Sequence, residues 1–282
     1  MSKKIVYEDI QEMVEFVQSK MTIRPTVGIV CGTGLGGINE VINDKEIVKF
    51  SDIPNLPQTT VTSHAGQFVL GRLPCGKEVM VQQGRYHFYE GHDQSIIVAP
   101  IRMMKLMGVE TLILTNAAGG LNQSYSIGDI MVIKDHIYFP GFAGNSPLVG
   151  PNDKRFGERF PPIYNLYDRE LRKKMLKCAE QLGMDFVRHG IYASVAGPHY
   201  ETIFDMRFLL KNGCDAVGMS TSGEAICGAH IGLKVVAMSG VSNKFVDSEE
   251  VENFVDGDEV TQVVNNGVSY VSKLLERFIS EL

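Results

Sequence analysis

Three apolar runs of this chain end directly in clusters of small residues, and this repeated arrangement limits the fold more than any other feature. The runs and the clusters that follow them are residues 26–31 before Gly32-Thr-Gly-Leu-Gly-Gly37, residues 110–115 before Asn116-Ala-Ala-Gly-Gly120, and residues 186–196 before Gly197-Pro-His-Tyr-Glu-Thr202. Apolar runs bounded by turn residues are typical of strands, and α/β sheets place their ligands at strand ends. We therefore expect an α/β fold with ligand-binding loops at these clusters.

Hydrophobic periodicity predicts the other elements. The predicted helices cover residues 8–20, 95–107, 168–182, a stretch ending at 212, the region of 224–232, and the C-terminal segment from about 258. The remaining predicted strands cover residues 127–137, 215–219 and 234–241, together with a hairpin formed by 67–73 and 77–83. No repeat, low-complexity tract or linker divides the sequence, so we expect one domain over residues 1–282.

Charge and cysteine content exclude several classes of protein. The chain has 27 basic and 33 acidic side chains, a net charge of −6, so nucleic acids and anionic membrane surfaces are not expected partners. Its five cysteines include no C-x-x-C pair, which argues against a disulfide framework or a structural zinc site. Acidic residues near the N-terminus replace the apolar stretch of a signal peptide, and no run resembles a membrane span. We expect a cytoplasmic protein.

The loop Gly32-Thr-Gly-Leu-Gly-Gly37 admits three interpretations. It matches the G-x-G-x-x-G pattern of dinucleotide-binding sheets, and Asp52 lies at about the spacing of the acid in such sites. However, Asp52 precedes Ile-Pro-Asn-Leu-Pro, which indicates a loop rather than the end of a second strand. Alternatively, the glycines only allow a tight turn, or they let backbone N–H groups converge on a phosphate, with the Thr33 hydroxyl as a further donor. The loop alone does not distinguish these three.

The segment Gly84-Arg-Tyr-His-Phe-Tyr-Glu-Gly91 is a more specific candidate. If it is extended, Arg85, His87 and Tyr89 point to the same face. Arginine offers a planar fork for phosphate oxygens, histidine a donor of adjustable charge, and tyrosine a flat ring with a hydroxyl for a sugar. A surface strand with solvated charges is the alternative, but three such groups on one face favour a site. His64 lies in another glycine-containing loop, where a single histidine is more often structural.

With six further motifs, these two segments resemble purine nucleoside phosphorylase. The further motifs are Thr115-Asn-Ala-Ala-Gly-Gly-Leu121, Gly128-Asp-Ile-Met131, residues 150–160, Ala196-Gly-Pro-His-Tyr-Glu-Thr202, Ala216-Val-Gly-Met-Ser-Thr221 and Ser242-Asn-Lys244. The resemblance covers almost the whole chain and points to the trimeric, low-molecular-mass class that prefers 6-oxopurines. It implies a single domain with a mixed, twisted central sheet flanked by helices, and a homotrimer.

The resemblance also implies roles for individual residues. The implied phosphate ligands are Thr33, His64, Arg85, His87, the backbone of Ala117, and Ser220. The implied purine contacts are Tyr200, Glu201, Val217, Gly218 and Asn243, and the implied ribose contacts are Tyr89, Met219 and Phe160 from a neighbouring subunit. Asn243, His87 and Glu201 are the candidate catalytic residues.

The chemistry of these side chains fits phosphorolysis. Breaking a glycosidic C–N bond passes through an oxocarbenium-like transition state, with negative charge developing on the departing purine. Phosphate on the opposite face would be the nucleophile, while Asn243 accepts a hydrogen bond from N7–H and donates one to O6. Glu201 would accept from N1–H, which a 6-oxopurine carries and adenine lacks. The reaction requires no metal or redox cofactor, and inorganic phosphate is a co-substrate.

One position departs from the family pattern. Many members have a histidine that contacts the ribose 5′-hydroxyl, and here Val255-Asp-Gly-Asp-Glu-Val260 places Gly257 at that position. We therefore expect tolerance of 5′-modified nucleosides. The departure keeps a methylthioadenosine or other 6-aminopurine nucleoside phosphorylase as the alternative, although that activity usually uses an aspartate where this chain has Asn243.

Two other classes of function are weaker candidates. A nucleoside-binding module without catalysis would not need the whole phosphate set, and a nicotinamide-dependent dehydrogenase would bind NAD and show no dependence on phosphate.

Overall fold

A single mixed sheet organises the molecule. The computed structural model describes residues 4–32, 36–61, 65–248, 250 and 257–282, with side chains of the last segment from residue 269. Within these residues the strands follow the order β2-β3-β4-β1-β5-β8-β7-β6-β9. Their bounds are β1 Val27–Cys31, β2 Asn43–Lys49, β3 Gln67–Arg72, β4 Glu78–Gln83, β5 Thr111–Gly120, β6 Ile130–Tyr138, β7 Val187–Ser194, β8 Ala216–Gly218 and β9 Lys234–Lys244.

Strand β9 pairs with two strands, and this closes half of the sheet on itself. It runs parallel to β5 along its whole length and antiparallel to β6 at its centre. Because β8 and β7 connect β5 to β6, the strands β5, β8, β7, β6 and β9 form a closed ring. The remaining strands extend from β5 as an open sheet. Parallel and antiparallel pairs coexist, so the expected mixed α/β sheet is confirmed.

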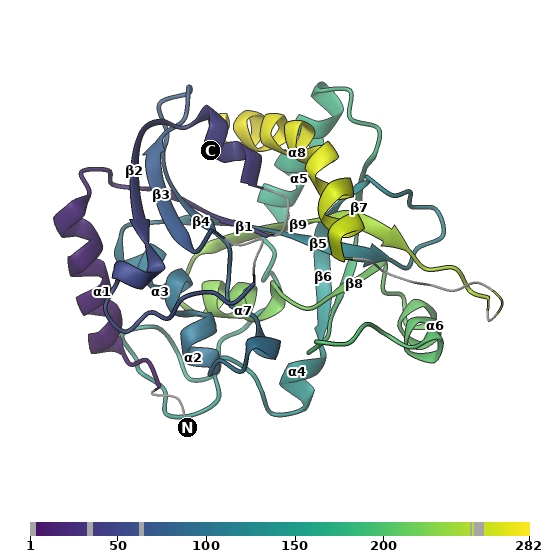
Figure 1. The fold of residues 1–282 in the computed structure, drawn as a ribbon, viewed down its shortest axis with the longest axis horizontal. Coiled ribbons are helices and arrows are strands. Elements are labelled where there is room, and N and C mark those ends of the chain that lie inside the picture. Colours follow the sequence, from purple (N-terminus) through teal and green to yellow (C-terminus); the bar gives the residue numbers. More distant parts are fainter. Residues whose placement is uncertain (1–3, 33–35, 62–64, 249, 251–256) are drawn as a thin grey trace.

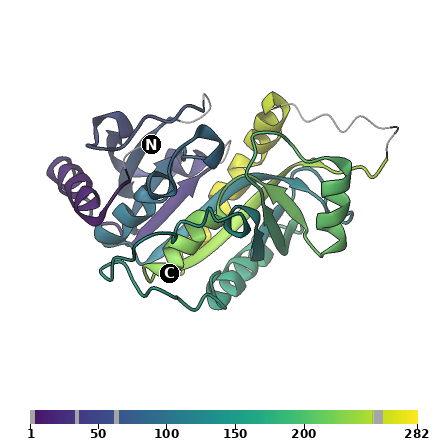
Figure 2. The ribbon, with the colours of Figure 1, turned by 90° about the horizontal axis from the view of Figure 1, so that it is seen from below.

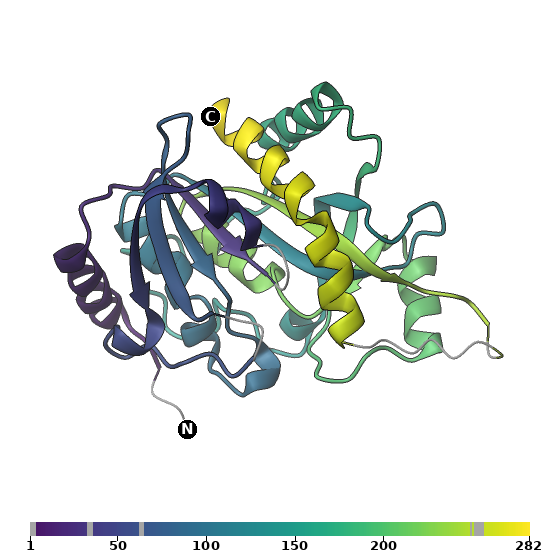
Figure 3. The ribbon, with the colours of Figure 1, turned by 45° about the horizontal axis from the view of Figure 1, so that its top comes forward.

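Helices cover both faces of the sheet. The helices are α1 Tyr7–Lys20, α2 Gln94–Ile97, α3 Ala99–Leu106, α4 Phe139–Phe142, α5 Arg169–Gln181, α6 Ile203–Lys211, α7 Ser222–His230 and α8 Gly257–Ser280, with short 3-10 turns η1 Gly36–Val41, η2 Phe50–Asp52 and η3 Phe88–Glu90. α5 and α8 lie on one face, and α1, α3 and α7 lie on the other (Figure 1). Figure 3 shows α8 crossing its face of the sheet. α1 and α6 lie at opposite ends of the molecule (Figure 2).

Each face of the sheet has its own apolar core. Val271, Leu275 and Phe278 of α8, which recur at helical spacing, are buried with Met175 and Cys178 of α5. The opposite core contains residues of α1, α3 and α7, among them Ile10, Val17, Ile101, Met104 and Cys227. A pocket lies where β5, β8 and β9 end.

Most predicted elements are confirmed, and the differences have local causes. The predicted helix 95–107 is two helices, because Val98 separates α2 from α3 and Pro100 occupies the first turn of α3. β2 was missed because six of its seven side chains are not buried, so it has no apolar alternation. β5 and β9 extend beyond their predicted ends, residues 115 and 241, to Gly120 and Lys244.

Asp52 does not end a second strand. It closes the short turn η2, as the loop-like sequence after it indicated. The acid that a dinucleotide site requires at the end of its second strand is therefore not provided by Asp52.

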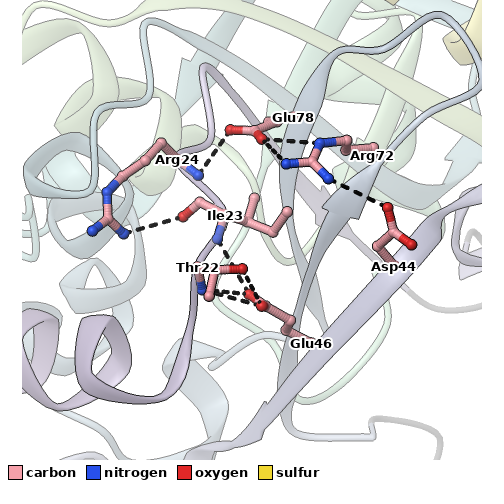
Figure 4. Close-up of polar contacts among 7 residues, drawn as sticks. All are labelled: Thr22, Ile23, Arg24, Asp44, Glu46, Arg72 and Glu78. Carbon is pink, nitrogen blue, oxygen red and sulfur yellow. Dashed lines mark hydrogen bonds and ion pairs between the residues drawn. The ribbon is translucent and has the colours of Figure 1, made fainter.

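The carboxylate of Glu46 ties the segment after α1 to the edge strand β2 (Figure 4). It accepts hydrogen bonds from the Thr22 N–H at 2.8 Å, the Thr22 hydroxyl at 2.6 Å and the Ile23 N–H at 3.3 Å. Beside it, Arg72 of β3 and Glu78 of β4 form an ion pair at 2.8 Å. Although partial burial acts to raise the pKa of Glu46, the hydrogen bonds from Thr22 hold it below its usual value.

We expect Glu46→Ala to lower the free energy of unfolding by about 1–2 kcal/mol, because three donors lose a charged acceptor. Denaturant unfolding at neutral pH measures this loss. Since the pKa is lowered in the folded state, the contribution is present above the unfolded pKa of about 4.3 and disappears as the pH falls below it. Glu15→Ala on the exposed side of α1 is the control, and a similar loss in both variants would contradict the role of Glu46.

Candidate active site

The ends of β5, β8 and β9 meet at a pocket of about 220 Å³. Eleven of the predicted site residues line it: Arg85, His87, Tyr89, Ala117, Tyr200, Glu201, Val217, Gly218, Met219, Ser220 and Asn243. The first and last of them in the chain, Arg85 and Asn243, are 158 residues apart. The pocket therefore gathers most of the predicted phosphate, purine and ribose contacts in one place.

Among the described residues, Phe160 is the one predicted site residue that does not line this pocket. Thr33 and His64 lie outside the described residues. Phe160 is 87% exposed, and the guanidinium of Arg159 lies 5.6 Å from the centre of its ring. Because Phe160 is expected to reach the pocket of a neighbouring subunit, its role stays a prediction.

Arg85 is buried and held from two sides. Its Nε and Nη2 contact the two carboxylate oxygens of Glu224 at 3.1 and 3.0 Å. Its Nη1 donates to the carbonyl of Thr115 at 2.6 Å and lies 3.5 Å from Ser220 Oγ. A Cβ on Gly32 would lie 3.0 Å from the same Nη1 and 2.7 Å from the Thr115 carbonyl, so the guanidinium needs a glycine at the end of β1.

His87 is oriented by Glu90. Its Nδ1 lies 3.2 Å from Glu90 Oε1, and its backbone N–H donates to the same oxygen at 2.7 Å. Burial acts to raise the pKa of Glu90, but hydrogen bonds from His87 and Thr60 lower it to about 2. An ionised Glu90 can only accept, so His87 donates through Nδ1. The ring stacks on Tyr89 with centroids 4.7 Å apart.

The expected extended conformation of this segment is only partly correct. Arg85 and His87 precede the turn η3, which contains Tyr89. All three side chains nevertheless line the pocket. Burial raises the pKa of the Tyr89 phenol to about 12, so its hydroxyl is neutral and can both donate and accept.

Ser220 is presented by a strained turn at the start of α7. Thr221 has φ +71° and ψ −53°, and the Ser222 N–H donates to the Ser220 carbonyl at 2.8 Å. This γ-turn costs a residue other than glycine about 1–3 kcal/mol. Asn116 holds it, because its Nδ2 donates to Thr221 Oγ1 at 2.7 Å. The strain therefore occurs beside two residues that line the pocket.

Asn243 lies at a bulge between β5 and β9. The pairing moves from Ala118 with Val241 to Gly119 with Asn243, so Ser242 is the extra residue. Ser242 Oγ donates to Asn243 Oδ1 at 2.9 Å. A Cβ on Gly119 would lie 3.3 Å from Asn243 Nδ2, so the glycine leaves room for the amide.

Glu201 has no part in capping α6. The capping box of this helix is formed by Thr202 and Asp205, whose side chains each accept from the other's backbone N–H. Burial raises the pKa of the Glu201 carboxyl above its usual value, and the charge of Asp205 acts in the same direction. Tyr200 beside it is 51% exposed and also lines the pocket.

Comparison with known proteins assigns the family. The sequence profile of the phosphorylase superfamily matches residues 26–280. Mouse purine nucleoside phosphorylase is 42% identical over 100% of this chain and 96% of its own length, and purine nucleoside phosphorylase 1 of Bacillus subtilis is 40% identical over 96% and 98%. The structure of Schistosoma mansoni purine nucleoside phosphorylase with inosine superposes with a TM-score of 0.95, at 40% identity over 100% and 99% of the two chains.

The chain belongs to the purine nucleoside phosphorylase family. The resemblance stated from its motifs is therefore confirmed, and with it the single-domain mixed α/β fold of these enzymes.

Several residues around the pocket were not predicted. Further lining residues are Gly32, Asn116, Ala118, Gly119, Gly120, Leu121, Met206, Ser242, Lys244 and Phe245. Some of them, such as Asn116 and Lys244, belong to the family motifs and could have been found there. Glu224, which pairs with Arg85 across 139 residues of sequence, carries no local signal because only the fold brings the two together.

Among the described residues, no group of three or more histidine, cysteine, aspartate or glutamate side chains could hold a metal ion. No helix there is long and apolar enough to cross a membrane.

The ionised Glu90 gives a pH-dependent prediction. Its folded pKa is about 2 instead of 4.5, so its contribution to stability is complete above pH 4.5 and decreases as the pH falls toward 2. We expect Glu90→Gln to be less stable than wild type at pH 7, and the difference to shrink by about 1 kcal/mol at pH 4. Denaturant unfolding at both pH values measures this, and a difference independent of pH would contradict it.

Proposed function

We propose that the pocket binds inorganic phosphate beside a purine nucleoside and catalyses the reversible phosphorolysis of inosine, guanosine and their 2′-deoxy forms. The products are the free base and ribose or deoxyribose 1-phosphate. Membership of the purine nucleoside phosphorylase family supports this reaction. The observation that carries the proposal is that the predicted phosphate, ribose and purine contacts line one pocket.

At the phosphate end, we assign the ligands to Arg85, His87, Ser220 and the backbone of Ala117, with Thr33 and His64 as further ligands. The short distance between Arg85 and Ser220, 3.5 Å from Nη1 to Oγ, supports binding to a single small anion. Arg85, Ser220 and the backbone N–H of Ala117 can donate to phosphate oxygens, and His87 Nε2 can accept from the hydroxyl of a monohydrogen phosphate.

At the purine end, Asn243 and Glu201 stabilise the departing base, with Tyr200, Val217 and Gly218 forming the walls. Asn243 Oδ1 already accepts from Ser242, which leaves a second lone pair for N7–H and the Nδ2 group for O6. Negative charge grows on the purine as the C–N bond lengthens, so the bond that Asn243 Nδ2 donates to O6 strengthens in the transition state. Asn243 Oδ1 accepts from N7 once that nitrogen has taken up a proton from solvent. His87, oriented by Glu90, binds the phosphate that attacks the ribose.

The ribose lies between these two ends, against Tyr89 and Met219. We propose that Phe160 of a neighbouring subunit closes the pocket in a homotrimer. The 87% exposure of this large apolar ring supports a partner surface. We also propose a cytoplasmic location, since the five cysteines are unpaired and only Cys75 is exposed.

A 6-aminopurine nucleoside is the second candidate substrate. A relative that is 40% identical, purine nucleoside phosphorylase of Schistosoma mansoni, has been solved in complex with adenosine. The raised pKa of Glu201 also favours this candidate at acidic pH, because a protonated carboxyl can donate to the unprotonated N1 of adenine.

Phosphate-dependent release of the base tests the proposed function. Inosine and adenosine are each incubated with the enzyme with and without phosphate, and the base is followed by ultraviolet absorbance. Hypoxanthine release that requires phosphate supports the leading reaction, and a preference for adenosine would move the assignment to the second. No release from either nucleoside would refute both.

We expect Asn243→Ala to lower kcat on inosine by about 10²-fold or more, the loss found when one charge-stabilising donor is removed. Asn243→Asp is the matched variant, because an aspartate of nearly the same size can accept from a 6-amino group but cannot donate to O6. It should lower the ratio of inosine to adenosine turnover. Unchanged inosine turnover in both variants would remove Asn243 from the mechanism.

Gly257 begins α8, and residues 251–256 before it lie outside the described residues. Since glycine offers no side chain to the ribose 5′-hydroxyl, we expect the kcat/KM for 5′-deoxyinosine to lie within about 10-fold of that for inosine, whereas losing a charged or well-formed hydrogen bond costs more. Steady-state kinetics with the two nucleosides measures the ratio, and a much larger loss would show that another group holds the 5′ end.

A further inference from the structure

The buried partner of Arg85 does not belong to the pocket. Glu224 lies in the first turn of α7, with its side chain 3% exposed, and contacts both Nε and Nη2 of Arg85. Arg85 lines the pocket, whereas Glu224 does not. Instead, Glu224 lines an adjoining cavity of about 30 Å³, which shares His87, Met219 and Ser220 with the pocket. The printed contacts of the carboxylate reach the pocket through Arg85.

The first turn of α7 and the residues just before it hold several parts of the phosphate end together. Ser220 and the N-cap residue Thr221 precede the first helical turn of α7, and Glu224 lies within that turn. Asn116 of β5 donates to Thr221, and Arg85 donates to the carbonyl of Thr115, the residue before Asn116. Contacts from α7 and from β5 thus fix both the position and the plane of the Arg85 guanidinium.

We propose that Glu224 is a positioning residue that fixes the Arg85 guanidinium and cancels its charge, so that the anion is selected by hydrogen-bond directions rather than by positive charge. This rests on the proposed function, in which Arg85 binds phosphate. A bidentate carboxylate restricts the guanidinium to one plane. In that plane the Nη1 atom stays between the Thr115 carbonyl and Ser220 Oγ.

Stability alone does not account for this pair. Replacing a buried ion pair with apolar side chains is often neutral or stabilising, so burying Arg85 and Glu224 does not in itself strengthen the fold. The pair does, however, change the potential in the pocket. The ion pair with Glu224 offsets the charge of Arg85 before any anion arrives, and the carboxylate of Glu90 beside His87 adds further negative charge. An anion gains its binding energy there from directed donors.

The test separates charge from position with two variants of Glu224. Glu224→Gln keeps the size of the side chain but removes its charge, and its amide nitrogen faces an Arg85 donor. We expect sulfate, a non-reacting anion of similar shape, to bind about 3–10-fold more tightly than to wild type, and kcat on inosine to fall about 10²-fold, since small displacements of a positioning group have effects of this size. Glu224→Asp keeps the charge but cannot reach both nitrogens, so sulfate affinity should stay near that of wild type while kcat falls.

A matched control is Asp129→Asn, which removes the charge of another buried carboxylate, here one whose partner Arg188 is 40% exposed. Asp129 is 4% exposed, pairs with Arg188 at 3.2 Å, and does not line the pocket. It should lower stability without changing sulfate affinity or the KM for phosphate. Isothermal titration with sulfate and steady-state kinetics on inosine are measured for all four proteins.

Each outcome decides the proposal. Tighter sulfate binding together with a lower kcat in Glu224→Gln supports the proposal. It is also supported if Glu224→Gln folds only when phosphate or sulfate is present, because the anion then replaces the missing counter-charge. Unchanged or weaker sulfate binding in Glu224→Gln would overturn it, as would a variant that stays unfolded with and without anion while Glu224→Asp has wild-type kcat. If wild type itself releases no base, the proposed function fails, and the sulfate titrations still test the pairing of Glu224 with Arg85.

Discussion

The double pairing of β9 is the constraint on which the pocket depends. By joining both β5 and β6, this strand closes five strands into a ring and fixes the ends of β5, β8 and β9 against one another. The bulge at Ser242 then sets the direction of Asn243, and Gly119 opposite leaves the room that the amide needs. The part of the pocket formed by β5, β8 and β9 stands on strands, which holds Asn243 in a defined geometry.

The sequence could predict what is encoded locally. The hairpin of β3 and β4, the helix capped by Asp168 and the apolar stripe of α8 all follow from residues near one another in the chain. β2 could not be predicted, because its side chains are polar and its place at the edge of the sheet is decided by pairing with β3. Most site residues came from recognisable motifs, but Glu224 acts across 139 residues, and only the fold reveals its partner.

An acidic chain that binds an anion needs an explanation, and the pocket offers one. The net charge is −6, and two described side chains of the proposed phosphate site, Arg85 and His87, each contact a buried carboxylate. In the proposed arrangement, the charge of Arg85 is therefore not what concentrates phosphate there. Hydrogen-bond donors in a partly buried site interact more strongly with an anion than they would in water, because the local dielectric is lower. The direction of the hydrogen-bond donors and their burial, rather than net charge, then account for the proposed binding of the anion.

Thr221, the strained residue beside the pocket, shows how a local backbone preference and a side-chain hydrogen bond can conflict. A glycine at position 221 would adopt the observed φ of +71° without strain. However, a glycine has no hydroxyl to accept the bond that Asn116 donates at 2.7 Å, and Asn116 would then be buried with an unpaired donor, which costs about 1–3 kcal/mol. That cost is similar to the strain of a threonine in this conformation. Threonine is thus retained at little or no net loss of stability, and its hydroxyl links β5 to the turn that presents Ser220.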